Sequence, residues 1–409
     1  MQFPISKRAT WLPLLCVGLA AILPLAAACG DDSTSSTPTP SEASATTAAP
    51  SASADASSAT ARGGGATIPA DIGKGDHAQL TGAGATFPQP IYQAWFDDYN
   101  SKVASGVQVN YQGAGSGAGI QQYTEKNVDF GASDVGMTDD QITAAGGPGK
   151  VQLLPTVIGA VVLSYNVPGV SQALKLDGAA VANIYLGTIK KWDDPALKTL
   201  NPGVALPDKD IVVVYRSDSS GTSGVFTDYL SKVSSDWKSK VGSATAPNWP
   251  TGQGGQGNPG VANLVKNTPN SIGYVELTYA LQNKISFAQL ENKSGKFVTA
   301  SIDSASAAAA GVTVPDDYRV SITNADGQDA YPIATFTYLL LYKQDGKCSA
   351  QQPLVNLLWW AYNDSGAQAT IKDLNYAPLP SNLVSRIDAT LKSLKCDEGA
   401  KASLGGSST

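Results

Sequence analysis

The segment Ile211-Val-Val-Val-Tyr-Arg-Ser-Asp-Ser-Ser220-Gly-Thr-Ser-Gly-Val-Phe226 changes character halfway along its length. Its first residues are β-branched or aromatic, which is typical of a buried strand. Small and hydroxyl residues follow over 217–223, and from Gly224 to Val233 the apolar side chains fall on one side of a helix. We therefore predict a strand that ends near Tyr215, then a turn, then a helix from Gly224 to Val233.

The same alternation of short apolar strands and amphipathic helices continues on both sides of this segment. Predicted strands are 107–111, 157–165, 211–215 and 336–342, and predicted helices are 88–103, 224–233, 352–362 and 382–394. Alternating strands and helices predict an α/β fold. The Gly-rich residues 252–259 are interpreted as a surface loop or lid, and residues 301–311 as an Ala/Ser-rich segment with no assigned state.

Composition limits both the size of the fold and its function. The chain has 409 residues, which corresponds to two domains, or to one bilobal domain with tails. Its net charge of −6 argues against nucleic acid as a partner, because binding a phosphate backbone needs a basic surface. The single histidine, His77, stands beside a Gly-rich stretch ahead of the first periodic segment, which argues against a Ser-His-Asp triad. No second imidazole exists for a His-Glu-x-x-His zinc site. No metal site or cofactor is predicted.

The N-terminus has the composition of an export signal. Two basic residues precede an almost wholly apolar run that ends in Ala26-Ala27-Ala28, and Cys29 follows in a pattern that resembles a bacterial lipobox. We predict a signal peptide over 1–28 and a lipid anchor on Cys29; a retained transmembrane anchor is the alternative. Residues 29–78 are rich in Ser, Thr, Ala, Pro and Gly, and we predict a disordered linker because they cannot bury enough apolar surface to fold.

Three turns rich in glycine and hydroxyl residues precede predicted helices, at 81–88, 113–119 and 217–223. A helix start carries unpaired N–H donors and a partial positive charge, so it is suited to a tetrahedral anion. Each hydroxyl taken singly can equally be a helix N-cap. Arg216 adds a planar donor for oxyanions that Asp218 could hold in place, although this spacing is equally consistent with a surface ion pair.

A rival interpretation of residues 113–118 is dinucleotide binding. They match the Gly-x-Gly-x-x-Gly/Ala fingerprint, and Asp134 stands near the expected distance. A lone fingerprint is weak evidence, and export would remove the protein from the cofactor pool. No Gly-x-x-x-x-Gly-Lys-Ser/Thr loop supports a P-loop ATPase.

These segments resemble the PstS family, the phosphate-binding proteins of high-affinity phosphate ABC transporters. The matching motifs are Thr81-Gly-Ala-Gly-Ala-Thr-Phe-Pro88, Val109-Asn-Tyr-Gln-Gly-Ala-Gly-Ser116, Val128-Asp-Phe-Gly-Ala-Ser-Asp134, Leu154-Pro-Thr-Val-Ile-Gly159, Ile184-Tyr-Leu-Gly187, Lys191-Trp-Asp-Asp194, Ser220-Gly-Thr-Ser223 and Ile272-Gly-Tyr-Val-Glu276. The resemblance implies a bilobal type 2 periplasmic-binding-protein fold, in which two α/β lobes are joined by two crossover strands. It places lobe I at 79–156 plus 332–398 and lobe II at 157–331.

The resemblance also implies a set of phosphate ligands. By residue type they are Thr86, Phe87, Ser116, Asp134, Arg216, Ser220, Gly221 and Thr222, with Asp218 as the partner of the arginine. Asp134 is the selective group, because an ionised carboxylate can only accept a hydrogen bond. Protonated phosphate species can donate a P–OH to it, whereas sulfate at neutral pH has no proton to donate.

Cys348 and Cys396 are the cysteines that remain beyond the predicted signal peptide and anchor. In an oxidising compartment an even pair is typical of a disulfide, which would tie the strand ending near Lys343 to the last helix. Two unpaired, buried thiols are the alternative.

The predicted function is capture of inorganic phosphate outside the cytoplasm and its delivery to the permease subunits of an ABC importer, without enzymatic turnover. The protein is expected on the outer face of the bacterial cytoplasmic membrane, held there by its lipid anchor. Two alternatives remain. One is a surface adhesin or phosphate-sensing lipoprotein, and the other is an exported phosphohydrolase with Ser220 or Ser116 as nucleophile. The sequence has no His/Asp spacing that would supply the phosphohydrolase with a metal cluster.

Overall fold

The structure is a computed structural model that describes residues 66–344 and 346–397. The predicted signal peptide, the predicted anchor Cys29 and the greater part of the predicted linker lie outside the described residues. Within the described part of the chain, no helix combines the length and the apolar composition that a membrane span requires.

The last part of the linker prediction is wrong, because residues 66–77 already belong to the fold. Ile72 is buried and Ile68 packs against the same hydrophobic core. The carboxylate of Asp76 is also buried and accepts a hydrogen bond from Asn356 Nδ2 at 2.8 Å. The two isoleucines supply the apolar surface that the Ser- and Ala-rich residues before them lack.

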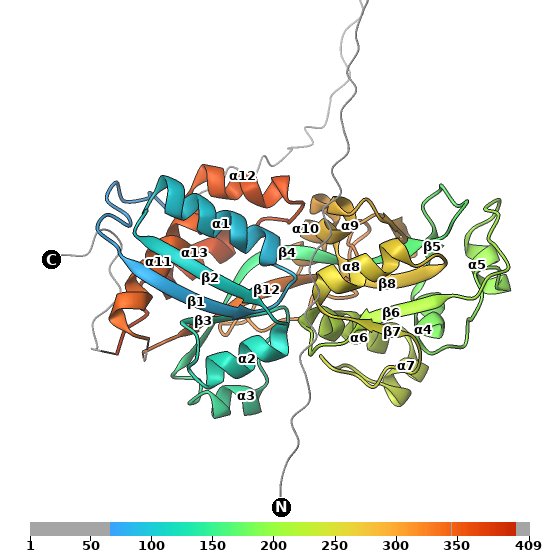
Figure 1. The fold of residues 1–409 in the computed structure, drawn as a ribbon, viewed down its shortest axis with the longest axis horizontal. Helices are drawn as coiled ribbons and strands as arrows, with labels where there is room; N and C mark the ends of the chain where they lie inside the picture. The colour runs from blue at the N-terminus through green and yellow to red at the C-terminus, as the bar shows by residue number, and fades with distance from the viewer. Residues whose placement is uncertain (1–65, 345, 398–409) are drawn as a thin grey trace, which may run out of the picture. The chain divides into compact units, whose positions relative to one another are not determined.

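A nine-stranded sheet forms the framework, in the order β2-β1-β3-β12-β4-β8-β6-β7, with β9 also paired to β4 (Figure 1). We call β2-β1-β3 the first half of the sheet and β8-β6-β7 the second half; the strands within each half are parallel. The strands are β1 (Ala78–Gly84), β2 (Val107–Gly113), β3 (Phe130–Ser133), β4 (Val151–Asn166), β6 (Val212–Arg216), β7 (Gln253–Gly255), β8 (Ser271–Glu276), β9 (Ser286–Phe287) and β12 (Ala334–Tyr342). A separate three-stranded sheet contains β5 (Lys175–Leu176), β10 (Gln289–Glu291) and β11 (Phe297–Val298).

Two long antiparallel strands join the halves. β4 pairs with β12 from Val151 to Ala160 and with β8 from Val161 to Asn166. β12 pairs in turn with β3 through Tyr338–Leu340. Every residue of β4 except the last is buried, in agreement with its near-continuous apolar sequence. The predicted α/β fold with two crossover strands is confirmed.

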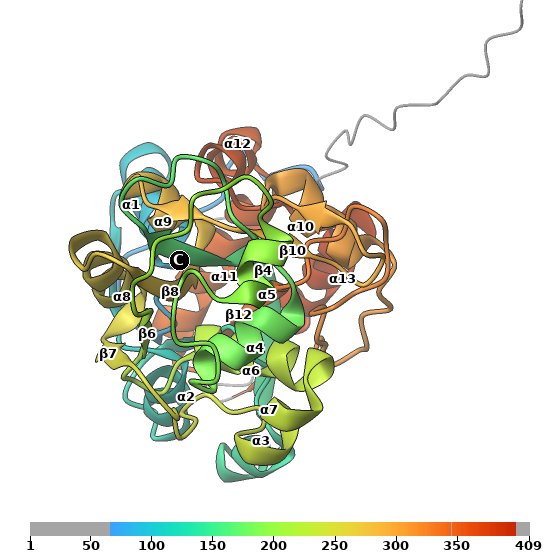
Figure 2. The same ribbon diagram turned by 90° about the vertical axis from the view of Figure 1, so that its right-hand side faces the viewer.

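Helices cover both faces of each half. On the first half, α1 and α11 lie on one face and α2 on the other (Figure 1). On the second half, α8 lies on one face of β6 and β8, with α4 and α6 on the other (Figure 2). The helices are α1 (Gln89–Lys102), α2 (Ser116–Thr124), α3 (Asp139–Ala144), α4 (Gly178–Tyr185), α5 (Pro195–Leu200), α6 (Gly221–Val233), α7 (Ser235–Lys240), α8 (Gly257–Asn267), α9 (Leu277–Gln282), α10 (Ile302–Ala310), α11 (Cys348–Asn363), α12 (Ser365–Asp373) and α13 (Ser381–Leu391).

Two segments differ from their predicted states. Residues 252–259 are not a surface loop, because β7 pairs with Val214–Arg216 of β6 and α8 begins directly after it. The helix predicted from Gly224 begins at Gly221, since Ser220 caps it by accepting a hydrogen bond from Ser223 N at 3.1 Å. Residues 301–311, which had no assigned state, form α10 with Ser301 as its N-cap.

The structure joins Cys348, the first residue of α11, to Cys396 by a disulfide. The bridge spans 48 residues and fastens the end of the described chain, beyond α13, to α11. This is the pairing that an oxidising compartment predicts.

Candidate anion-binding site

Four strand ends carry the predicted ligand residues to one place between the two halves of the sheet. Thr86 and Phe87 follow β1, Ser116 follows β2, and Asp134 follows β3 directly. Arg216 ends β6, residues 217–220 form the turn, and Gly221 and Thr222 begin α6. Because ligands of open α/β sheets bind at the carboxyl ends of strands, this is the expected position for a site.

Arg216 is held in a fixed orientation. Its Nε donates to Asp218 Oδ1 at 2.8 Å, its Nη2 donates to Asp218 Oδ2 at 2.5 Å, and its Nη1 donates to Thr222 Oγ1 at 3.1 Å. Burial alone would raise the pKa of Asp218, but the hydrogen bonds and charge of Arg216 outweigh it and hold this pKa below its ordinary value. The side chains are only 1% and 12% exposed, so this is not a surface ion pair. A guanidinium fixed in this way is a preorganised donor for an oxyanion.

Four buried hydroxyls surround the same place: those of Thr86, Ser116, Ser220 and Thr222. Each accepts a hydrogen bond from nitrogen at 3.0–3.2 Å; the donors are, in turn, Asn258 N, Asp134 N, Ser223 N and Arg216 Nη1. A hydroxyl has two lone pairs and a single O–H. Because the nitrogens occupy lone pairs, the O–H groups can donate. That of Thr222 donates to Asp134, and those of Thr86, Ser116 and Ser220 are left as donors for whatever binds in the site.

Asp134 is the exception, because its carboxylate accepts. Oδ1 accepts from Thr337 Oγ1 at 2.9 Å, and Oδ2 accepts from Thr222 Oγ1 at 3.3 Å. Burial raises the pKa of Asp134 to about 7, although the Thr337 hydrogen bond and the charge of Arg216 partly oppose this shift. The group can thus exist in either protonation state near neutral pH.

The two halves of the sheet touch at the site. Gly117 N, in α2, donates to Ser219 O at 2.9 Å. A Cβ on Gly221 would lie 2.3 Å from Ser116 Oγ and 2.8 Å from Asp134 N. Gly115 has a φ of +93°, and a Cβ there would lie 2.3 Å from Asp218 Oδ2. Glycine at 115 and 221 permits a backbone approach that any side chain would prevent.

Sequence reasoning missed Asn258, which is fully buried at the start of α8. Its Nδ2 donates to Thr86 Oγ1 at 3.0 Å and to Thr222 Oγ1 at 3.2 Å. The turn before it, between β7 and α8, has the same strand–glycine–helix design as the three turns that were recognised. That likeness was the signal that could have identified Asn258.

Two tyrosines donate hydrogen bonds to the backbone of the turn after β1. Tyr279 Oη donates to the carbonyl oxygen of Thr86 at 2.6 Å, and Tyr376 Oη donates to that of Phe87 at 2.6 Å. Tyr376 Oη also lies 3.3 Å from Oε2 of Glu276, whose pKa burial raises well above its usual value. Because the Thr86 carbonyl and the Phe87 N–H belong to one peptide plane, the bond from Tyr279 also fixes the direction of that N–H.

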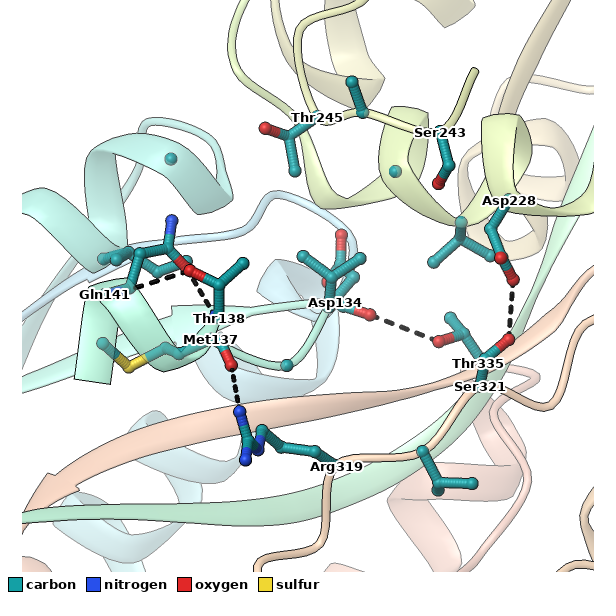
Figure 3. Close-up of a pocket in the computed structure, with 18 of the residues that line it drawn as sticks. Asp134, Met137, Thr138, Gln141, Asp228, Ser243, Thr245, Arg319, Ser321 and Thr335 are labelled. Atoms are coloured by element: carbon teal, nitrogen blue, oxygen red, sulfur yellow. Dashed lines mark hydrogen bonds between the residues drawn. The ribbon is translucent and has the colours of Figure 1, made fainter. Parts of the chain in front are cut away.

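A cavity of about 810 Å³ lies beside the site and is lined by both halves (Figure 3). Figure 3 shows Thr138 and Gln141 on one side of Asp134 and Asp228 and Ser321 on the other. Of the predicted ligand residues, Asp134 alone lines this cavity. The other predicted ligand residues are buried and are not exposed in this cavity.

Within the described ranges, one group of three potential metal ligands comes together: Cys348, Cys396 and Asp397. The two sulfur atoms are joined in the disulfide, so neither is a thiolate that could bind a metal ion. The group is therefore not a metal centre in this state.

Comparisons with known proteins agree with this geometry. Residues 39–356 match the family model described as a PBP superfamily domain. A "Phosphate-binding protein PstS" of Xylella fastidiosa (strain 9a5c) is 41% identical over 329 residues, 80% of this chain and 88% of the relative. A second "Phosphate-binding protein PstS", from Pasteurella multocida (strain Pm70), is 43% identical over 326 residues, which cover 78% of this chain and 92% of that relative. The crystal structure of a phosphate-binding protein from Stenotrophomonas maltophilia has a TM-score of 0.58 at 19% identity, over 76% of this chain and 93% of that one, which shows a shared fold.

Proposed function

Because this chain belongs to the PstS family of phosphate-binding proteins, we propose that it captures inorganic phosphate outside the cytoplasm and delivers it to an ABC importer. The proteins of this family bind a solute rather than transform it. The proposed ligand residues are Thr86, Phe87, Ser116, Asp134, Arg216, Ser220, Gly221 and Thr222, with Asp218 orienting the arginine.

The arrangement of the four hydroxyls carries this proposal. All four accept from nitrogen; Thr86, Ser116 and Ser220 have their O–H left to donate, whereas the O–H of Thr222 donates to Asp134 Oδ2. Together with the fixed guanidinium of Arg216, they form a set of donors suited to a compact ion with acceptors on all sides. The N–H groups at the start of α6 add to the same field, because a helix N-terminus favours an anion.

Asp134 accounts for the choice among tetrahedral anions. When it is ionised it needs a hydrogen-bond donor, and monohydrogen or dihydrogen phosphate supplies one through P–OH. Sulfate would place an acceptor against the buried carboxylate without a proton between them. Sites that hydrogen-bond a substrate OH reject analogues lacking it by about 10⁴–10⁵.

We also propose that lobe I comprises 79–156 plus 332–398 and lobe II comprises 157–331. Ligands then come from both lobes, so phosphate would hold the lobes together when it binds. A ligand held in this way is released when the lobes separate, and docking on permease subunits would provide that step.

The remaining proposals concern the environment of the protein. The export signal and the lipobox-like sequence support a lipid on Cys29, which would hold the protein at the outer face of the membrane. The Cys348–Cys396 disulfide would form in that oxidising compartment. The test is a Cys29→Ser variant followed by membrane fractionation and intact-mass measurement. Release into the soluble fraction, with loss of the lipid mass, is expected; unchanged retention and mass would overturn the anchor.

Calorimetry tests the main proposal. The mature chain, stripped of endogenous phosphate, is titrated with phosphate and then with sulfate. One-to-one phosphate binding with no sulfate response is expected. Arg216→Met should abolish this binding, whereas the matched control Arg386→Met, on α13, should retain it. Absence of phosphate binding by the unaltered chain, or equal binding by both variants, would refute the proposal.

A further inference from the structure

Asn258 links the predicted ligands of the two halves of the sheet. It lies at the start of α8 and is fully buried. Its backbone N–H and its Nδ2 both donate to Thr86 Oγ1, each at 3.0 Å. Nδ2 also donates to Thr222 Oγ1 at 3.2 Å. Thr86 follows β1 in the first half, whereas Thr222 belongs to α6, which packs on the second half.

The hydrogen bonds of these two threonines leave them no freedom of direction. Thr86 Oγ1 accepts both nitrogens of Asn258, which occupy its two lone pairs. Thr222 Oγ1 accepts from Asn258 Nδ2 and from Arg216 Nη1, which occupy both of its lone pairs. Each hydroxyl can therefore only donate. The O–H of Thr222 donates to Asp134 Oδ2 at 3.3 Å, and the O–H of Thr86 is left for the ligand.

The amide of Asn258 is itself fixed. Its Oδ1 accepts from the backbone N–H of Glu276 at 2.9 Å. A flipped amide would place Nδ2 against this N–H, leaving two donors facing each other in a buried place. The Glu276 N–H therefore keeps Nδ2 directed at the threonines.

We propose that Asn258 is a positioning residue that fixes the Thr86 and Thr222 hydroxyls as obligatory donors, Thr86 to the anion and Thr222 to the carboxylate of Asp134. This inference rests on the proposed function. A hydroxyl that can only donate must face a phosphate oxygen that carries no proton. The protonated oxygen of phosphate is then left to Asp134, where the accepting carboxylate lies. Asn258 thus sets how bound phosphate is oriented, although it is not one of the proposed ligands.

The sharpest test is Asn258→Asp, which changes one NH₂ group to an oxygen of similar size. One carboxylate oxygen keeps the hydrogen bond from Glu276 N, and the other faces Thr86 and Thr222. Both hydroxyls would then donate to this oxygen, so that Thr86 is lost to the ligand and Thr222 to Asp134. We expect phosphate affinity to fall at least about 100-fold, since buried groups left unpaired each cost roughly tenfold or more.

The matched control is Asn201→Asp. Asn201 is also buried, and its Nδ2 donates to the carbonyl oxygens of Lys175 and Leu197, away from the site. The Asn201→Asp variant likewise loses two hydrogen bonds donated by Nδ2, so it should lower the melting temperature without changing phosphate affinity by more than about twofold. Equal affinities of the two variants would overturn the role of Asn258.

A double-mutant cycle with uncharged substitutions tests whether Asn258 acts by positioning the Thr86 hydroxyl or only by supporting the fold. Asn258→Ala is measured in the unaltered chain and in a Thr86→Val background, with melting temperatures as a check on folding. If Asn258 acts through the Thr86 hydroxyl, its loss weakens binding much less in the Thr86→Val background. Equal fold-losses in both backgrounds would overturn the inference while phosphate binding by the unaltered chain stands. No phosphate binding by the unaltered chain would overturn the proposed function itself, and the inference with it.

Discussion

Asp134→Asn should narrow the difference between phosphate and sulfate affinity while leaving the fold intact. Asn is close to Asp in size, and its Oδ1 can keep the hydrogen bond that Asp134 Oδ1 accepts from Thr337 at 2.9 Å. The second carboxylate oxygen, 3.3 Å from Thr222 Oγ1, is replaced by an NH₂ group. An acceptor that faces the ligand thus becomes a donor, and the buried negative charge disappears.

The size of the effect follows from the two hydrogen bonds that change. Phosphate loses the bond from its P–OH to a charged acceptor, worth about 1.5–3 kcal/mol, which is roughly 10- to 150-fold in affinity. Sulfate exchanges an opposed acceptor for a donor and should gain by a similar factor. The ratio of the two affinities, of order 10⁴–10⁵ in a site of this kind, should therefore fall by about 10²–10⁴.

The assay is calorimetric titration of the phosphate-free variant with each anion at pH 8, above the Asp134 pKa of about 7. Asp140→Asn is the matched control, because Asp140 is exposed on α3 and removing it makes the same change in net charge. Its ratio of affinities should equal that of the unaltered chain. A ratio for Asp134→Asn that also stays unchanged would refute the assignment of Asp134 as the acceptor of the phosphate proton.

Three further results are expected. Because burial raises the pKa of Asp134 to about 7, the folded, phosphate-free protein holds a proton that the unfolded chain releases near pH 4. Denaturant unfolding should therefore show stability lost as pH rises from about 4 to about 7, and the loss should be smaller in Asp134→Asn, where the raised pKa of buried Glu276 still contributes to it. Gly221→Ala should weaken phosphate binding at least about 100-fold in calorimetry, because its Cβ would lie 2.3 Å from Ser116 Oγ; unchanged affinity would contradict the close approach of the two halves. Replacing Cys348 and Cys396 together by Ala should lower the free energy of unfolding by up to about 4 kcal/mol yet leave phosphate affinity unchanged, since the bridge lies outside the site.

Much of the site could be predicted because its residues are local features of the chain. Thr86, Ser116 and Ser220 each stand in a short glycine-containing turn between an apolar strand and a helix. Such turns are recognisable from a few consecutive residues, and three of them at strand ends indicate one site. The strand order brings Thr86 and Ser116 together in the first half, and β4 joins that half to the one that carries Ser220.

What the sequence did not predict depends on contacts between distant segments. β7 has three residues, of which two are glycine, so its strand state comes from pairing with β6 rather than from local preference. Asn258 was missed for this reason. The raised pKa of Asp134 likewise depends on burial and on Thr337, 203 residues further along the chain. No local pattern carries that information.

The strand order has a consequence for the biosynthesis of the chain. β3 ends at Ser133, but its neighbour β12 begins only at Ala334, and the first part of β4 needs the same partner. A chain synthesised from its N-terminus therefore holds two unpaired strand edges until Tyr342 has been added. Contacts between such distant segments form slowly, because a long loop must close first. The emerging chain thus remains unable to complete its fold, and its unpaired edges are prone to aggregation until the last strand is made.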